Sequence, residues 1–285
     1  MEVMFLQVRH GGSLFYRTFV GEKMNCCMPM AYDIRRMKNI IVAVICLATM
    51  PTLVSAACVE QEPAAPLSVE WVVGTVVSEA ELKGTPAEMW FRAEEISDEV
   101  FARMWLRSWK RECPLRRSDL RYLKMLYCNA DGKPQRGEMV VSVSIAEKVL
   151  RIFRRLYEAG YRIERMELID NYMADDETAM RANNSSAFNF RFMTGSTIKV
   201  SKHGLGLAID INPLYNPYVK RKANGMWHIE PSTAKPYAFD RDRREDIPCK
   251  ISHEDLAYKL FKEEGFEWGG DWNSLKDYQH FEYNQ

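Results

Sequence analysis

Three stretches of the chain predict helices, two of them from apolar residues that recur at helical spacing. The longest set follows Ser144 and predicts a helix that Ser144 caps and that runs to Gly160, with one apolar face made of Ile145, Val149, Ile152, Phe153 and Leu156. A second helix is predicted within residues 93–109, closing near Cys113 and Pro114, from the spacing of Ile96, Val100, Met104 and Leu106. Ser252-His-Glu-Asp255 has the form of a capping box and predicts a third helix ending at Gly265.

Alternating or short apolar runs predict the strands. Residues 120–128 and 138–144 flank the turn sequence Asn129-Ala-Asp-Gly132 and predict a hairpin. Further strands are predicted at 161–169, 207–211, 266–268 and 280–283, and 183–197 is predicted to be a polar, aromatic-rich loop. Strand pairs and helices alternate irregularly, so we expect an α+β fold, with an antiparallel central sheet and flanking helices.

The N-terminal part has the pattern of a secretory signal. Arg35, Arg36 and Lys38 precede an apolar run over 40–50, and Val54-Ser55-Ala56 provides a cleavage site. The run is shorter than the about 20 residues of a membrane-spanning helix. We therefore expect three parts: an upstream extension plus signal peptide (1–57), a tether (58–70) and a domain (71–285). Because residues 1–36 lie upstream of a normal signal, we expect translation to start at Met30 or Met37.

The signal predicts an exported protein of the periplasm or cell envelope. Two modes of export stay open at Cys58: cleavage before it with lipid attachment to its thiol, or simple cleavage and soluble release. Cys113, Cys128 and Cys249 lie beyond the leader. Cys113 and Cys128 either form a disulfide or, like Cys249, remain buried free thiols.

Composition narrows the classes of partner. The chain has 285 residues, 47% hydrophobic and 27% charged, which is typical of a globular protein with one large or two modest domains. Lys plus Arg and Asp plus Glu both number 39, so no overall charge favours a nucleic acid, and we expect none as partner. We expect a monomer.

The charged segment 224–248 either lines a substrate groove or is a plain surface loop.

Three side chains have the chemistry of zinc ligands: His203, Asp210 and His280. Three protein ligands leave a fourth position for water, as in catalytic sites. Positions 203 and 210 would lie on opposite faces of a continuous strand, because their separation is odd. Gly204 and Gly206 allow a turn after His203, so Asp210 can approach the same point.

Two carboxylates near His280 are candidates for the general base. Asp277 would lie beside His280 if the chain turns tightly there, and could take a proton from zinc-activated water. Glu282 shares a strand face with His280 and is either the alternative base or a hydrogen-bond partner of that histidine. His10, His228 and His253 are expected to be ordinary surface or core residues.

From about Leu120 to Tyr283 the sequence resembles the zinc D-alanyl-D-alanine carboxypeptidases and L-alanyl-D-glutamate endopeptidases, the VanY-like peptidoglycan peptidases, whose fold is shared with the hedgehog signalling domain. The blocks that carry the resemblance are residues 183–191, 201–213, 216–218, 269–272 and 277–282. Many relatives carry glutamate where this chain has Asp277, although aspartate is familiar in the endopeptidase branch. An aromatic residue or alanine often stands where Leu205 follows Gly204.

The resemblance implies a Zn²⁺ peptidase that cuts peptidoglycan stem peptides, with His203, Asp210 and His280 on the metal and Asp277 as base. Arg191 would stabilise the oxyanion or grip a substrate carboxylate, and Ser201 would contact the substrate. The residues leave open which bond is cut, D-Ala-D-Ala or L-Ala-D-Glu. Two alternatives belong to other classes of function: a zinc-containing wall-binding or signalling module with little hydrolysis, and an adhesion domain without zinc, in which the three ligand residues would be a coincidence.

Overall fold

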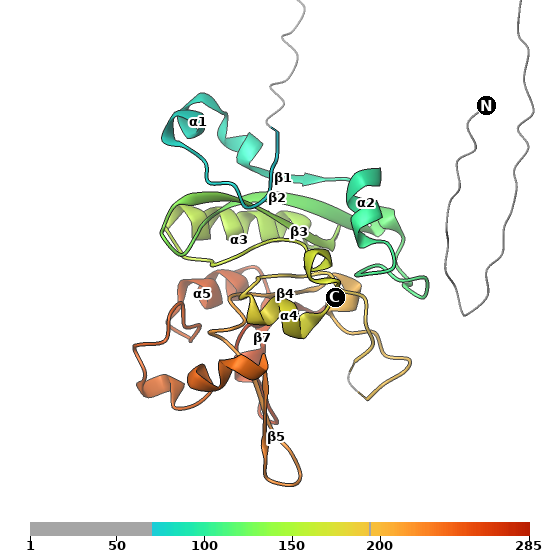
Figure 1. The fold of residues 1–285 in the computed structure, drawn as a ribbon, viewed down its shortest axis with the longest axis vertical. Coiled ribbons are helices and arrows are strands. Elements are labelled where there is room, and N and C mark those ends of the chain that lie inside the picture. Colours follow the sequence, from blue (N-terminus) through green and yellow to red (C-terminus); the bar gives the residue numbers. More distant parts are fainter. Residues whose placement is uncertain (1–69, 194) are drawn as a thin grey trace, which may run out of the picture. The chain divides into compact units, whose positions relative to one another are not determined.

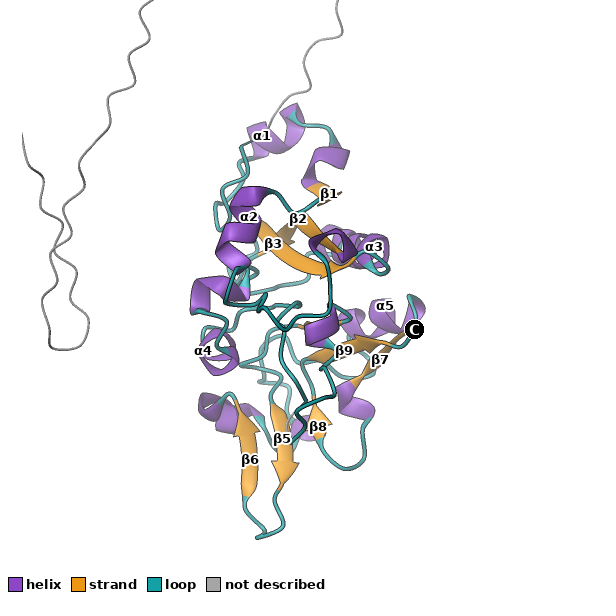
Figure 2. Cartoon of the chain, turned by 90° about the vertical axis from the view of Figure 1, so that its right-hand side faces the viewer, coloured by secondary structure: helices purple, strands orange, loops and turns teal. Residues whose placement is uncertain are grey.

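The strands form three antiparallel sheets of three strands each in the computed structural model, which describes residues 70–193 and 195–285 (Figure 2). This mixture of helices and small antiparallel sheets confirms the α+β class, with three sheets in place of the one central sheet expected. The predicted signal peptide, Cys58 and nearly all of the predicted tether lie outside the described residues. None of the helices in the described part is both long and apolar enough to cross a membrane.

The first sheet contains the predicted hairpin. Its strands are β1 (Phe91–Glu94), β2 (Leu120–Cys128) and β3 (Pro134–Ser142), in the order β1-β2-β3. The Asn129 side chain accepts hydrogen bonds from the backbone N–H groups of Asp131 and Lys133, which fixes the turn between β2 and β3. The hairpin is therefore confirmed.

Two helices flank the main core. The predicted helix after Ser144 is confirmed as α3 (Ala146–Glu158), but its N-cap is Ile145 without a side-chain cap, because the Ser144 hydroxyl bonds to that of Ser142. The predicted third helix is α5 (Leu256–Glu263). It begins later than the capping box implied, since the carboxylate of Asp255 accepts the N–H of Ala257 and is itself the cap.

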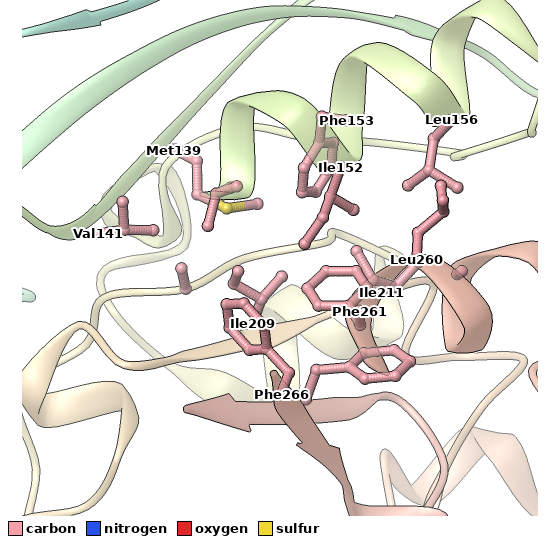
Figure 3. Packing of buried hydrophobic residues seen from close by; sticks show 14 of the residues in the cluster. Met139, Val141, Ile152, Phe153, Leu156, Ile209, Ile211, Leu260, Phe261 and Phe266 are labelled. Carbon is pink, nitrogen blue, oxygen red and sulfur yellow. The ribbon is translucent and has the colours of Figure 1, made fainter. Parts of the chain in front are cut away.

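The main core lies between two layers, with the first sheet and α3 on one side and the second sheet and α5 on the other (Figures 1 and 3). The second sheet has the order β4-β9-β7, with β4 at Ala208–Asp210, β7 at Phe266–Trp268 and β9 at His280–Tyr283. All three match predicted strands. Phe281 of β9 is fully buried and stacks on Phe261 of α5 at 4.2 Å between ring centroids, which anchors β9 in the core.

The third sheet has the order β6-β5-β8 (Figure 2). Its strands are β5 (Tyr218–Arg221), β6 (Trp227–Glu230) and β8 (Lys276–Asp277). The charged segment 224–248 thus contributes a strand to a sheet as well as surface turns. The remaining helices and 3-10 turns are α1 (Glu79–Gly84), α2 (Asp98–Met104), α4 (Asp176–Arg181) and Ala87–Trp90, Arg117–Asp119, Ile169–Tyr172, His203–Leu205, Ser232–Tyr237, Arg241–Arg243 and Gly269–Asp271.

One predicted helix is shorter than expected, and one predicted strand is wrong. The helix expected within 93–109 is only α2, because residues up to Glu94 pair with β2 and the Ser97 hydroxyl caps a helix that starts at Asp98. Residues 161–169 do not form a strand: only Arg162 and Arg165 form isolated bridges, and a 3-10 turn begins at Ile169. The backbone N–H of Glu164 donates to the side-chain oxygen of Asn212, and that of Glu167 donates to the side-chain oxygen of Asn184. These backbone amides are therefore satisfied without a neighbouring strand. Cys113, Cys128 and Cys249 are free, so the disulfide alternative is not adopted.

Candidate metal centre

The pairing of β4 with β9 places two of the predicted ligands side by side. Asp210 lies directly opposite His280 in the antiparallel register, and opposed residues project from the same face of a sheet. Both side chains are buried, with 9% and 6% of their residue surface exposed. The strand pair itself therefore brings together residues that are 70 positions apart.

A short turn delivers the third ligand. His203 begins the 3-10 turn before β4, and the turn ends at Gly206 in the left-handed region with φ +65°. The Ser201 hydroxyl accepts the N–H of Gly204 at 3.0 Å and so fixes the start of the turn. The predicted turn after His203 is thus present.

The donor atoms of the three side chains converge. His203 Nε2 lies 3.1 Å from His280 Nδ1, and the Asp210 carboxylate faces both nitrogens, with Oδ1 3.0 Å from His280 and Oδ2 3.2 Å from His203. Donor atoms about 2.0–2.1 Å from a tetrahedral zinc ion would be roughly 3.3 Å apart. The observed spacing is close to that of one face of such a tetrahedron.

The other ring nitrogens fix which nitrogen faces the centre. His203 Nδ1 lies 2.7 Å from the carbonyl oxygen of Ala187 and donates to it, so its Nε2 carries a lone pair. His280 Nε2 lies 3.2 Å from a carboxylate oxygen of Glu282, so its Nδ1 is left as the acceptor. Two lone pairs and a carboxylate then meet within about 3 Å, an arrangement that needs a cation or extra protons to be stable. These residues fit a bound zinc ion.

The same contacts set the charges of the side chains in the cluster. Burial disfavours a charged His280, but hydrogen bonds with Asp210 and Glu282 outweigh burial and raise its pKa to about 10. Burial likewise opposes ionisation of Asp210, yet the two histidines hold its pKa well below the usual range. The hydrogen bond from His280 also lowers the pKa of Glu282. The carboxylates of Asp210 and Glu282 thus favour a positive charge on His280, which lies between them.

Asp277 reaches the centre from the end of β8. A tight turn at residues 278–279 joins it to β9, as the sequence predicted. Its Oδ1 is buried and has no hydrogen-bond partner among the described residues. Burial is the main reason that the Asp277 pKa rises to about 6, with Asp210 adding to the rise and His280 opposing it. A carboxylate with a free oxygen beside the donor cluster can exchange protons near neutral pH.

The side chains of Arg191 and Ser201 contact other residues instead of the donor cluster. The Arg191 guanidinium forms an ion pair with Asp176 of α4, at 2.7 Å. Ser201 is buried and its hydroxyl is used by the His203 turn. The structure brings together His203, Asp210, His280 and Glu282, with Asp277 beside them, and places Arg191 and Ser201 in supporting contacts.

Three supporting residues had no assigned role from the sequence. The carbonyl of Ala187 orients His203, and a backbone acceptor has no signature in the sequence. Trp272 lies with its ring 5.3 Å from that of His280. Gly269 leaves room for Asp277, because a Cβ there would lie 2.6 Å from the Asp277 carbonyl oxygen. Trp272 and Gly269 both fall in the Gly269-Gly-Asp-Trp272 block, which was a signal that could have identified them.

A comparison with protein families matches the part of the chain that contains the donor residues. Residues 194–283 match a family described as D-alanyl-D-alanine carboxypeptidase. The comparisons with curated proteins and with solved structures found no match. The matched segment contains the three donor residues, Asp277 and Glu282, and it begins after Arg191. It supports the resemblance found in the sequence and indicates a peptidase, which is a hydrolase.

Proposed function

We propose, from the carboxypeptidase family matched by residues 194–283, that this chain is an exported zinc peptidase that hydrolyses peptidoglycan stem peptides at a D-Ala-D-Ala or L-Ala-D-Glu bond. The observation that carries the proposal is the convergence of two oriented imidazole lone pairs and a carboxylate beside Asp277. We also infer the hedgehog/DD-peptidase fold, and a location in the periplasm or cell envelope, from the resemblance and the predicted signal peptide.

Each side chain of the site has a separate role in the proposed hydrolysis. His203, Asp210 and His280 would hold the zinc ion, which when bound lowers the pKa of water and polarises a carbonyl group. Asp277 accepts a proton as water adds to the peptide carbonyl carbon, and returns it to the nitrogen as the C–N bond breaks. Glu282 keeps the Nε2 proton of His280, so that Nδ1 stays available.

Arg191 is proposed to bind the substrate by exchanging one anion for another. Its present partner is Asp176, and side chains of both residues are about one-third exposed, at 37% and 35%. A substrate carboxylate could therefore replace Asp176 with little loss of charge pairing. Ser201 would act through the turn that holds His203. A binding module without hydrolysis is disfavoured by the free carboxylate of Asp277.

The test combines metal analysis with product analysis. The purified protein should contain about one zinc ion, and His203→Ala and His280→Ala variants should lose it. The zinc-loaded protein should cleave purified muropeptides, with the bond identified by mass spectrometry of the products. An Asp277→Asn variant should keep its zinc and lose most of its activity, about 100-fold or more. Full zinc retention in both histidine variants would refute the metal centre, and wild-type cleavage by the Asp277 variant would remove the base from the mechanism.

A further inference from the structure

A row of polar side chains leads away from Asp277 across the third sheet. Tyr218 of β5 lies directly opposite Asp277 of β8 on one side and directly opposite Glu230 of β6 on the other. Directly opposed residues of antiparallel strands project from the same face. Glu230, Tyr218 and Asp277 therefore form a continuous row on the face of the sheet that reaches the metal centre.

The electrostatics of Tyr218 agree with this placement. Burial raises the pKa of the Tyr218 phenol, and the negative charges of Asp277 and Glu230 raise it further. His228, on the same face, packs edge-on against the Tyr218 ring, with centroids 5.9 Å apart. Its Nε2 lies 2.8 Å from Glu230 Oε1 and so orients that carboxylate.

The far end of the row is open and acidic. The Glu230 side chain is 42% exposed, and its second carboxylate oxygen has no partner among the described residues. Lys220 shares this face but lies opposite His228, in the next pair on this face towards the hairpin tip. Level with Asp277, this face of the sheet thus presents the Glu230 carboxylate and the Tyr218 phenol, which suit a protonated amine.

We propose that Glu230 and Tyr218 bind a protonated side-chain amine of the peptide substrate. This inference rests on the proposed function, because it assigns specificity to the same site. Two strand spacings separate Glu230 from Asp277, a distance of about 10 Å. Two extended residues span about 7 Å, and the flexible four-carbon stem of a lysine covers the remainder. The amine would belong to a residue one or two positions from the cleaved bond.

The test compares two peptides that differ only in the charge of this amine. One is L-Ala-γ-D-Glu-L-Lys-D-Ala-D-Ala, which contains both candidate bonds, and the other carries Nε-acetyl-lysine. The zinc-loaded full-length protein should cleave the first with a kcat/KM about tenfold higher, as expected for a hydrogen-bonded charge pair near the surface. Glu230→Gln should remove this preference, lowering kcat/KM for the amine peptide about tenfold and leaving the acetylated peptide unchanged.

Arg221→Gln is the matched control. Arg221 is on the same strand as Tyr218 but pairs with Trp227, on the opposite face. This variant should retain the preference for the amine peptide. Equal cleavage of the two peptides by the wild type, or an equal loss for both in Glu230→Gln, would overturn the inference.

Binding measurements separate this inference from the proposed function. If the zinc-loaded wild type cleaves neither peptide, the proposed function fails, and calorimetric titration of the uncleaved peptides then decides the amine site. Tighter binding of the amine peptide by the wild type, abolished in Glu230→Gln, supports the site. Equal affinity for the two peptides refutes it.

Discussion

Removal of the Glu282 carboxylate should weaken zinc binding without removing the base. Glu282 accepts the Nε2 proton of His280 at 3.2 Å, and its side chain is only 17% exposed, so water screens this contact weakly. A carboxylate in this position raises the basicity of the ligand nitrogen and holds the ring in place. Loss of such a partner typically costs 10- to 100-fold in metal affinity, or about 1.4–2.7 kcal/mol.

Two substitutions at this position separate the effects of charge and hydrogen bonding. Glu282→Gln can still accept the Nε2 proton through its amide oxygen, so we expect a loss of zinc affinity near tenfold. Glu282→Ala loses the acceptor altogether, and we expect a loss approaching 100-fold. Competition against a chromophoric zinc chelator at pH 7.5 measures both changes. At saturating zinc, kcat of the Gln variant should stay within about threefold of the wild type, because Asp277 is unaltered.

Glu267→Gln is the control for a general change of charge. Glu267 pairs with Glu282 across β7 and β9 but is exposed. Its substitution removes a carboxylate directly opposite Glu282 and should leave zinc affinity unchanged. Wild-type zinc affinity in Glu282→Ala would refute the role of Glu282. A loss of kcat in Glu282→Gln that excess zinc does not restore would instead identify Glu282 as the base.

Three further predictions concern the neighbourhood of the centre. Because the pKa of Asp277 is raised to about 6 and the base acts as carboxylate, kcat/KM should fall as the pH drops below about 6; an unchanged rate at pH 5 with zinc retained would contradict this. Gly269→Ala should displace Asp277 and lower kcat at least tenfold with normal zinc content, whereas Gly84→Ala, where a Cβ meets nothing within 4 Å, should be neutral in the same assay. Phe281→Ala should lower the free energy of unfolding by about 3–5 kcal/mol in urea titrations, since the ring is fully buried on Phe261; a loss below 1 kcal/mol would show that the stack contributes little.

Local patterns predicted the elements whose stability comes from their own sequence. The β2–β3 hairpin follows from the turn at Asn129, and α3 follows from the apolar face that includes Val149 and Phe153. The segment 161–169 was predicted wrongly because side chains far away in the sequence satisfy its amides. Asn212 lies 48 positions from the Glu164 amide that it binds, and no local pattern contains that information.

The site was predictable in composition but not in geometry. The residue types at 203, 210 and 280 indicated zinc, and the resemblance joined them into one centre. Their actual proximity depends on the register of β4 against β9, which burial of Phe281 helps to fix. The pairing of Arg191 with Asp176 and the row from Asp277 to Glu230 also depend on long-range packing that spacing alone cannot reveal.

The distance along the chain between the donor residues has a further consequence for the proposed zinc enzyme. His203 and His280 are 77 positions apart, so a bound ion would act as a removable cross-link between β9 and the turn before β4. A ligand that binds only the folded protein stabilises it by about 4 kcal/mol at a thousand times its dissociation constant. The supply of zinc would then set how long the protein resists unfolding and proteolysis, and starvation for the metal would lower its abundance as well as its turnover.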